Sequence, residues 1–191
     1  MSYMPFSDNI AMPVCLITVK SDSIINSMTV AWSTPLSSNP PLWGFAIRKQ
    51  RFTYEILMKS KEFTVTFLPY EQAELAVKLG RISGREGDKL KICEVKLKDA
   101  EFISTPYIEE GYYSMECSLE DSFTTGDHEF IVGEILYVHK NNESLANSQP
   151  AIYLGKDTFS TVDKTRIKKF EARTILEEMR KKFSRGGQSD K

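Results

Sequence analysis

The sequence predicts a mainly β protein: a small barrel of mostly antiparallel strands with flanking helices. Short runs rich in β-branched and aromatic residues recur along the 191 residues, and several alternate apolar and polar positions. These runs do not alternate with long helices, as a doubly wound parallel sheet would require. An antiparallel barrel built as one domain therefore fits the pattern best.

Seven runs are expected to form strands. They are residues 12–19, 27–32, 42–47, 62–68, 112–121, 128–140 and 151–155.

Three further segments have helical spacing. Residues 52–61 place Tyr54, Leu57 and Met58 on one side, and residues 70–81 form a short amphipathic pattern that stops near Gly80. From Asp163 to Phe183 the pattern is again helical, and its candidate inward residues are Ile167, Phe170, Ile175, Leu176 and Met179. We expect one domain over residues 1–162, a C-terminal helix over 163–184 packed on or extending it, and a frayed tail over 185–191.

Composition excludes several classes of protein. The formal net charge is -1, and no basic stripe with interleaved aromatic residues is present, so we expect neither nucleic acid nor an anionic membrane as a partner. The longest apolar run, residues 10–19, contains Pro13 and is about half the length of a membrane span. No signal peptide is evident at the N-terminus, so a cytoplasmic location is the expectation.

Cysteine and histidine are too sparse for a predicted metal site. Cys15, Cys93 and Cys117 stand far apart, with no CxxC pair, and the only histidines are His128 and His139. Cys15 and Cys117 lie within apolar runs, which indicates reduced core cysteines. GxGxxG, P-loop, GxSxG and HExxH motifs are also missing, so any redox chemistry should be carried by a bound cofactor.

One stretch suggests a surface for a flat heterocycle. "MTVAWSTPLS" offers the hydroxyls of Thr29, Ser33, Thr34 and Ser37, and Trp32 could flank a ring. Prolines 35, 40 and 41 exclude regular helix here, so the segment is expected to be an irregular loop with uncommitted backbone N–H groups. The alternative is a polar loop whose hydroxyls cap their own turns.

A cluster of cations follows and suggests a phosphate site. Arg48, Lys49 and Arg51 fall within four residues, and Thr53 lies near a helix start. "SGREGDK" adds Arg85 and Lys89. In a strand-like run Lys49 should point to the opposite face from Arg48. The alternative is ordinary solvated surface charge.

Taken in order, these motifs resemble the flavin reductase-like FMN-binding proteins of the split-barrel type, most closely the flavoredoxin-like branch. The resemblance runs from about Met12 to about Tyr153. It is carried by "NSMTVAWSTPLSSNPP", "IRKQRFTYEI", "EFTVTFL", "SGREGDKLK", "MECSLED" and "GDHEFIVGEI". It implies a Greek-key split barrel, usually a homodimer, with FMN near the subunit interface.

The resemblance also implies a set of site residues. Those expected to line the isoalloxazine are Thr29, Trp32, Ser33, Thr34, Pro35 and Ser37. Those expected around the phosphate are Arg48, Arg51, Thr53, Arg85 and Lys89. Asp127 and His128 of "GDH" would lie by the flavin where a nicotinamide could approach, with His128 the one candidate catalytic residue; the alternative for His128 is a turn residue before a strand.

The leading hypothesis for function is an FMN oxidoreductase. Hydride would pass from NAD(P)H to FMN, and electrons would leave to free flavin, ferric iron or a redox partner protein. Backbone N–H groups of residues 33–37 could stabilise the charge that develops on the flavin. A second hypothesis is an FMN electron carrier that has no NAD(P)H site of its own.

Overall fold

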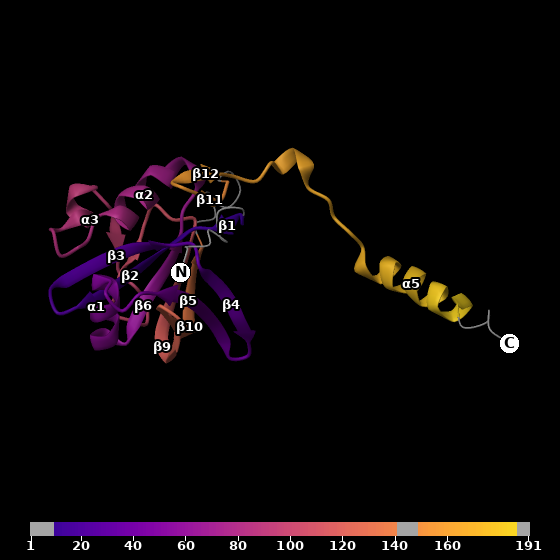
Figure 1. Ribbon diagram of the computed structural model, residues 1–191, viewed down its shortest axis with the longest axis horizontal. Helices are drawn as coiled ribbons and strands as arrows, with labels where there is room; N and C mark the ends of the chain where they lie inside the picture. The colour runs from indigo at the N-terminus through magenta and orange to yellow at the C-terminus, as the bar shows by residue number, and fades with distance from the viewer. Residues whose placement is uncertain (1–9, 141–148, 187–191) are drawn as a thin grey trace.

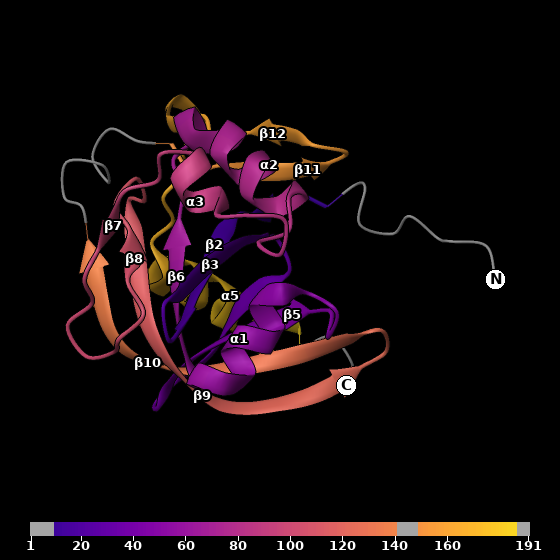
Figure 2. The same cartoon turned by 90° about the vertical axis from the view of Figure 1, so that its left-hand side faces the viewer.

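The fold is a mainly β barrel with flanking helices, as the sequence predicts. The computed structural model describes residues 10–140 and 149–186, and the expectations for the first nine residues and for residues 187–191 fall outside that range. The main sheet is antiparallel and has seven strands in the order β3-β2-β6-β9-β10-β5-β4. Helices α1, α2 and α3 lie against it (Figures 1 and 2).

The seven strands of the main sheet have these bounds. They are β2 (Cys15–Ser21), β3 (Ile24–Val30), β4 (Ser33–Ser38), β5 (Pro41–Ile47), β6 (Glu62–Phe67), β9 (Tyr113–Thr125) and β10 (His128–Lys140). Smaller strands are β1 (Met12–Pro13), β11 (Ile152–Gly155) and β12 (Thr158–Ser160) in one sheet, and β7 (Leu97–Lys98) and β8 (Tyr107–Ile108) in another.

The connection between β3 and β4 closes the sheet into a barrel. These strands lie at opposite edges of the sheet, yet only Ala31 and Trp32 separate them in sequence. The carbonyl of Trp32 accepts a hydrogen bond of 2.9 Å from the N–H of Ala46 in β5. The two edges therefore have to meet beside Trp32.

β2 explains why the first apolar run is nearly continuous. Cys15, Ile17 and Val19 belong to the core inside the barrel, where Phe45 and Phe63 also pack. Val14 and Leu16 belong to a second core. Because both faces of this segment are covered, both sets of alternating positions are apolar.

The helices have these bounds: α1 (Phe52–Ser60), the 3₁₀ turn η2 (Tyr70–Gln72), α2 (Ala73–Arg81), α3 (Lys89–Ile92), the 3₁₀ turn η3 (Lys164–Arg166) and α5 (Ala172–Gly186). The second core lies under α2 and α3, where Leu75, Leu79 and Leu90 pack on Val14 and Leu16.

Three sequence-based expectations are wrong in detail. Residues 33–38 form strand β4 and not an irregular loop. β4 pairs with β5 at the edge of the sheet, and an edge strand tolerates proline. The strand expected at residues 151–155 is not the last one, because β12 follows and turns back on β11 through Lys156 and Asp157, both with positive φ.

The C-terminal helix is the third correction. It begins at Ala172, later than expected, and lies away from the barrel (Figure 1). The side chains named as inward-facing are exposed: Ile167, Phe170, Ile175, Leu176 and Met179. Periodicity located an apolar face but could not indicate that this barrel does not cover it.

Candidate functional site

A cleft of about 390 Å³ opens between β3, the end of β5 and α2. Its lining combines charged and polar side chains with apolar ones, among them Met28 and Val30 on one side and Ala46 and Ile47 on another. The cleft forms here because β3 and the end of β5 approach one another where the barrel closes. The remaining lining residues are Val14, Thr29, Ala31, Trp32, Arg48, Arg51, Ala76, Val77, Gly80, Arg81, His128, Tyr153, Asp157 and Phe159.

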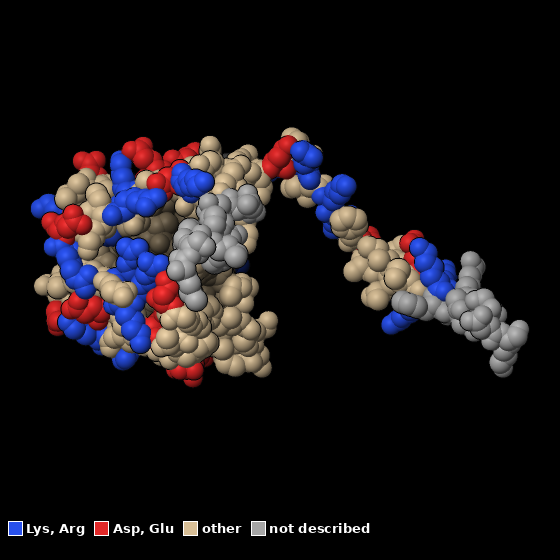
Figure 3. Space-filling model, in the orientation of Figure 1, with Lys and Arg blue, Asp and Glu red and all other residues tan. Residues whose placement is uncertain are grey.

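A second cavity of about 310 Å³ continues from the first. The two share five lining residues: Met28, Thr29, Arg51, Gly80 and Arg81. The second is more polar and is lined also by Asn26, Thr53, Arg85 and Lys89. Figure 3 shows Lys and Arg side chains gathered around a hollow in the barrel. The site is therefore a cleft with an apolar part, joined to a cationic cavity.

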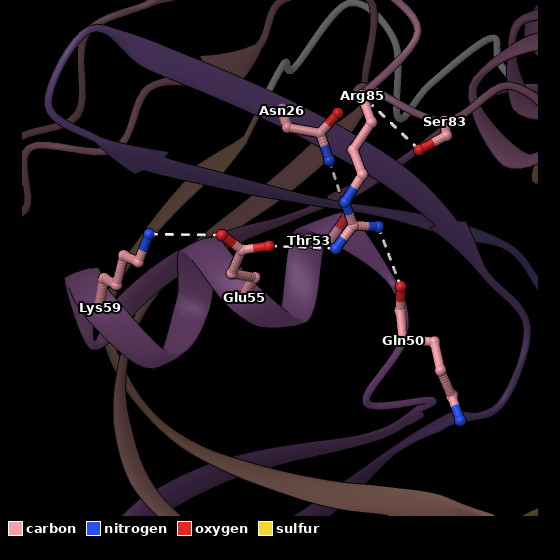
Figure 4. A network of polar contacts seen from close by, with 7 residues as sticks. All are labelled: Asn26, Gln50, Thr53, Glu55, Lys59, Ser83 and Arg85. Atoms are coloured by element: carbon pink, nitrogen blue, oxygen red, sulfur yellow. Dashed lines mark hydrogen bonds and ion pairs between the residues drawn. The ribbon is translucent and has the colours of Figure 1, made fainter.

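The loop before α3 is fixed to β3 and α1 (Figure 4). Arg85 donates hydrogen bonds of 3.0 Å to the carbonyl of Gln50 and 3.0 Å to Oε2 of Glu55, and its guanidinium lies 5.0 Å from the centre of the Phe52 ring. Hydrogen bonds from Arg85 and Lys59 lower the pKa of Glu55. Arg85 thus lines the cavity while it holds the loop in place.

Gly84 allows this loop to approach β3. A Cβ at Gly84 would lie 2.2 Å from Oδ1 of Asn26, a distance that no side chain can occupy. Asn26 in turn donates a buried hydrogen bond of 2.8 Å to Oγ1 of Thr53. Thr53 was expected as a helix cap, but the N-cap position of α1 is Arg51, and the Thr53 hydroxyl ties α1 to β3 instead.

Lys89 is a buried cation beside Arg51. Its Nζ donates to the carbonyls of Leu79, at 2.6 Å, and Ile82, at 2.9 Å, near the C-terminal end of α2. Burial, reinforced by the nearby Arg51 charge, lowers the pKa of Lys89 to about 8. An ammonium has three donors, so one remains beyond these two carbonyls.

A chain of polar contacts stands at the mouth of the cleft. Arg48 Nη2 lies 2.8 Å from Oδ2 of Asp127, and Oδ1 of Asp127 lies 2.7 Å from Nδ1 of His128. The His128 contact is the main cause of a lowered pKa at Asp127. The His128 ring packs on Trp32 with centroids 5.1 Å apart. The fold thus brings together two segments that the sequence separates widely.

Lys49 follows Arg48 but pairs with a different carboxylate. Its Nζ lies 2.8 Å from Oε1 of Glu129, and it does not line either cavity in the part of the chain described here. The hydrogen bond with Glu129 raises the pKa of Lys49 and lowers that of Glu129. Arg48 lines the cleft and Lys49 does not, but β5 ends at Ile47, so the strand-like run expected at these two cations does not form.

The chain matches a family model described as "Flavin reductase like domain" over residues 7–161. The chain belongs to this family. A relative from Archaeoglobus fulgidus, itself uncharacterized, is 32% identical over 127 residues, which are 66% of this chain and 71% of the relative.

Solved structures of flavin proteins share the fold of this family member. One is an FMN-binding protein from Thermus thermophilus with bound p-hydroxybenzaldehyde, at a TM-score of 0.80 and 27% identity, covering 90% of this chain and 96% of that one. Flavoredoxin of Desulfovibrio vulgaris (Miyazaki F) matches at a TM-score of 0.77 and 23% identity, covering 85% and 93%.

Four residues expected in the site of this flavin reductase-like protein lie outside the two cavities. Ser33, Thr34, Pro35 and Ser37 belong to β4 and are not among the described residues that line either space. Ser33 Oγ lies 3.5 Å from Cys15 Sγ, and Ser37 Oγ accepts a hydrogen bond from the N–H of Asn39. The turn-capping alternative therefore accounts for Ser37.

Sequence reasoning missed the β11–β12 hairpin that borders the cleft. Asp157 at its turn accepts hydrogen bonds from Arg81 of α2, with Nη2 2.6 Å from each carboxylate oxygen. This ion pair holds the hairpin against α2, and Tyr153 and Phe159 of the hairpin line the cleft. The signal was present in "LGKDT", a two-residue turn between apolar runs.

The buried cysteines of the described residues are not poised as nucleophiles. Burial raises the pKa of the Cys15 thiol to about 12 and raises that of Cys117 further, so both stay protonated. Among residues 10–140 and 149–186, no cluster of His, Cys, Asp and Glu could hold a metal ion. Over the same residues, no helix combines the length and apolar character of a membrane crossing.

Proposed function

We propose that this protein is an FMN-dependent oxidoreductase that takes electrons from NADH or NADPH. The observation that carries the proposal is the continuity of the apolar cleft with the cationic cavity. Its two ends suit the two ends of FMN, a flat ring system and a phosphate of about -1.5 to -2 charges near neutral pH. The Thermus thermophilus relative, named an FMN-binding protein, supports FMN as the flavin.

The apolar end of the site would hold the ring. Met28, Val30 and Ala46 exclude water from the space between β3 and β5, which strengthens polar interactions made there. FMN, when bound, supplies hydride and single-electron chemistry that no side chain of this chain offers. The protein's own contribution is to hold the ring in one orientation.

The cationic end would hold the phosphate. Arg51 reaches both cavities, and Lys89 lies next to it with one donor remaining. Charge-assisted hydrogen bonds to a phosphate are about twice as strong as neutral ones. Arg85 would add its charge while anchored to Glu55 and Gln50.

The mouth of the cleft would receive the nicotinamide. Asp127 fixes the orientation of the His128 ring, and the ring packs on Trp32. Two rings held in place at the mouth offer a surface against which a third flat ring could stack. In this proposal His128 positions the nicotinamide, and electrons then leave to free flavin, ferric iron or a partner protein.

We propose a homodimer as the working form. The cleft lies beside a sheet face with exposed apolar side chains, among them Leu36 and Phe123. Closed twofold dimers are the commonest assembly of soluble proteins. A second copy against this face would lie near Trp32 and His128 at the mouth.

The second candidate function is an FMN electron carrier. The observation that favours it is that Trp32 and His128 already stand together at the mouth, where they could exclude a nicotinamide. Electrons would then enter and leave through partner proteins alone.

Purified protein should first be titrated with FMN, FAD and riboflavin. We expect shifted absorbance and quenched fluorescence with FMN at micromolar protein, and weaker binding of riboflavin. No binding of any flavin would refute both functions. NADH and NADPH are then added anaerobically to the FMN complex. Bleaching of FMN at a catalytic rate supports the oxidoreductase, and a stable oxidised spectrum leaves only the carrier.

A further inference from the structure

The C-terminal segment after β12 leaves the barrel as an arm. We call residues 161–186 the C-terminal arm; it contains η3 and ends in α5 (Figure 1). Every residue from 162 to 182 is exposed. Isolated helices of about 12–15 residues are marginal in water, so α5 needs a surface to pack on.

The arm carries an apolar stripe. Ile175, Leu176 and Met179 lie at spacings that place them on one side of α5. Ile167 and Phe170, which precede the helix, are 72% and 69% exposed. Side chains of this size at this degree of exposure would be costly unless another surface covered them.

The barrel presents a matching apolar surface on the outer side of its sheet. Strand register places Leu42, Ala46, Phe130 and Val132 on the same side of β5 and β10, with Phe123 of β9 beside them. The Phe123 and Phe130 ring centres are 5.6 Å apart. Leu36 of β4 completes what we call the outer face.

Gly44 shows how closely the outer face is packed at its centre. A Cβ at Gly44 would lie 2.5 Å from the Phe130 ring and 2.8 Å from Leu36. Leu36 and Phe123 nonetheless remain 43% and 49% exposed. The side of the barrel over β4 is mostly free of charged side chains in Figure 3, and it is the side on which the arm lies.

The arm differs from the rest of the chain in the sign of its net charge. Residues 163–182 contain eight basic and four acidic residues, while the whole chain has a net charge of -1. The remainder of the chain therefore carries a net negative charge. A basic arm is attracted to a barrel of this composition, and its own barrel does not cover it.

We infer that the arm of each protomer packs along the barrel of a second copy of this chain. In this arrangement the apolar stripe of each arm covers the outer face of the partner's barrel, and the two arms clasp the dimer. The outer face adjoins the cleft, because Ala46 belongs to both. The open side of each cleft is then completed by the partner. The inference rests on the homodimer proposed above, and its tests separate the two.

The first test is photo-crosslinking in the full-length protein. We place p-benzoylphenylalanine at Leu176 of the arm, irradiate, and map the products. A covalent dimer with the crosslink in the partner's barrel is expected. Products confined to a single chain would overturn the inference. The control probe replaces Ile92, which is 75% exposed on α3 and lies far from the outer face, and should give no covalent dimer.

The second test measures the dimer dissociation constant by sedimentation in full-length variants. Ile175→Glu with Leu176→Glu should raise it at least tenfold, and Ile92→Glu should leave it unchanged. Loss of the dimer in Leu36→Glu but not in the arm variant would refute the clasp and keep the dimer. A monomeric wild-type protein would overturn both the clasp and the homodimer. Flavin titration of the same sample tests cofactor binding separately.

Discussion

The ammonium of Lys89 donates a 2.6 Å hydrogen bond to the carbonyl of Leu79 within the polar half of the site. A cation is thus buried at the C-terminal end of α2, where backbone carbonyls and the negative end of the helix dipole favour it. Arg51 lies beside this ammonium, and its positive charge disfavours the protonated form of Lys89. This balance should make the charge of the cationic cavity sensitive to pH.

FMN affinity should fall as pH rises through the pKa of Lys89, about 8. A bound phosphate favours the charged ammonium, so binding takes up a proton once Lys89 is neutral in the free protein. Because binding and protonation are linked, the dissociation constant of FMN then rises by up to about tenfold for each unit of pH. Fluorescence titrations between pH 7.5 and 9 measure this. Lys89→Met should bind FMN more weakly and lose this slope; an unchanged slope would show that another group titrates.

Arg51→Ala should weaken FMN binding far more than riboflavin binding. A charge-assisted hydrogen bond contributes about 1.5–3 kcal/mol, so the FMN dissociation constant should rise roughly ten- to over a hundredfold. Riboflavin lacks the phosphate and should bind almost as before. Lys49→Ala is the matched control, because Lys49 pairs with Glu129 away from both cavities. Equal losses for both ligands in Arg51→Ala would assign the cluster to folding.

His128→Ala should slow reduction of bound FMN by NADH or NADPH. Lost orientation of the nicotinamide is expected to lower the anaerobic rate by roughly tenfold or more. FMN affinity should change by less than about threefold, because a phosphate contact carries more of the binding free energy than a ring packed at the mouth. Stopped-flow absorbance measures the rate. Asp127→Asn, which keeps the shape of the partner of His128, should show a smaller loss of rate; a fully active His128→Ala would remove His128 from the proposal.

Glu116 should make the barrel less stable in acid. Burial would raise its pKa, but hydrogen bonds from the N–H groups of Glu101 and Phe102 and from His139 outweigh burial and lower it. A lowered pKa contributes stability above the unfolded value of about 4.3, and that stability is lost as pH falls through the folded pKa. Urea unfolding at pH 7 and pH 3 measures the difference.

Glu116→Gln should lose much of this acid dependence and be less stable at neutral pH. A hydrogen bond to a charged group contributes about 1.5–3 kcal/mol, and the buried carboxylate of Glu116 accepts several of them. The control is Glu109→Gln, which breaks an exposed pair with Lys98 and should cost far less stability. Similar losses in the two variants would mean that burial of Glu116 has no special effect.

Local pattern was enough to predict six of the seven strands of the main sheet, the first two helices and the mainly β class. The runs that form β6 and β10 alternate, and the Tyr54–Met58 spacing is helical, because each depends on only a few neighbouring residues. The buried state of Cys15 and Cys117 also follows from their apolar neighbours. The resemblance to the flavin reductase-like family was readable from the order of motifs, and the family match confirms it.

Only the tertiary structure decided which of the named residues meet. Arg51 and Lys89 are brought to one cavity by the packing of α2 and α3 on the barrel, and Asp157 reaches Arg81 through a hairpin that no local pattern singled out. The sequence indicated that Ser33 and Thr34 are polar, but not that they lie in a paired edge strand. It likewise indicated the apolar stripe of α5, but not which surface would cover that stripe. Pairing between distant strands and the burial of a face depend on contacts far apart in the chain, and neither propensity nor periodicity contains them.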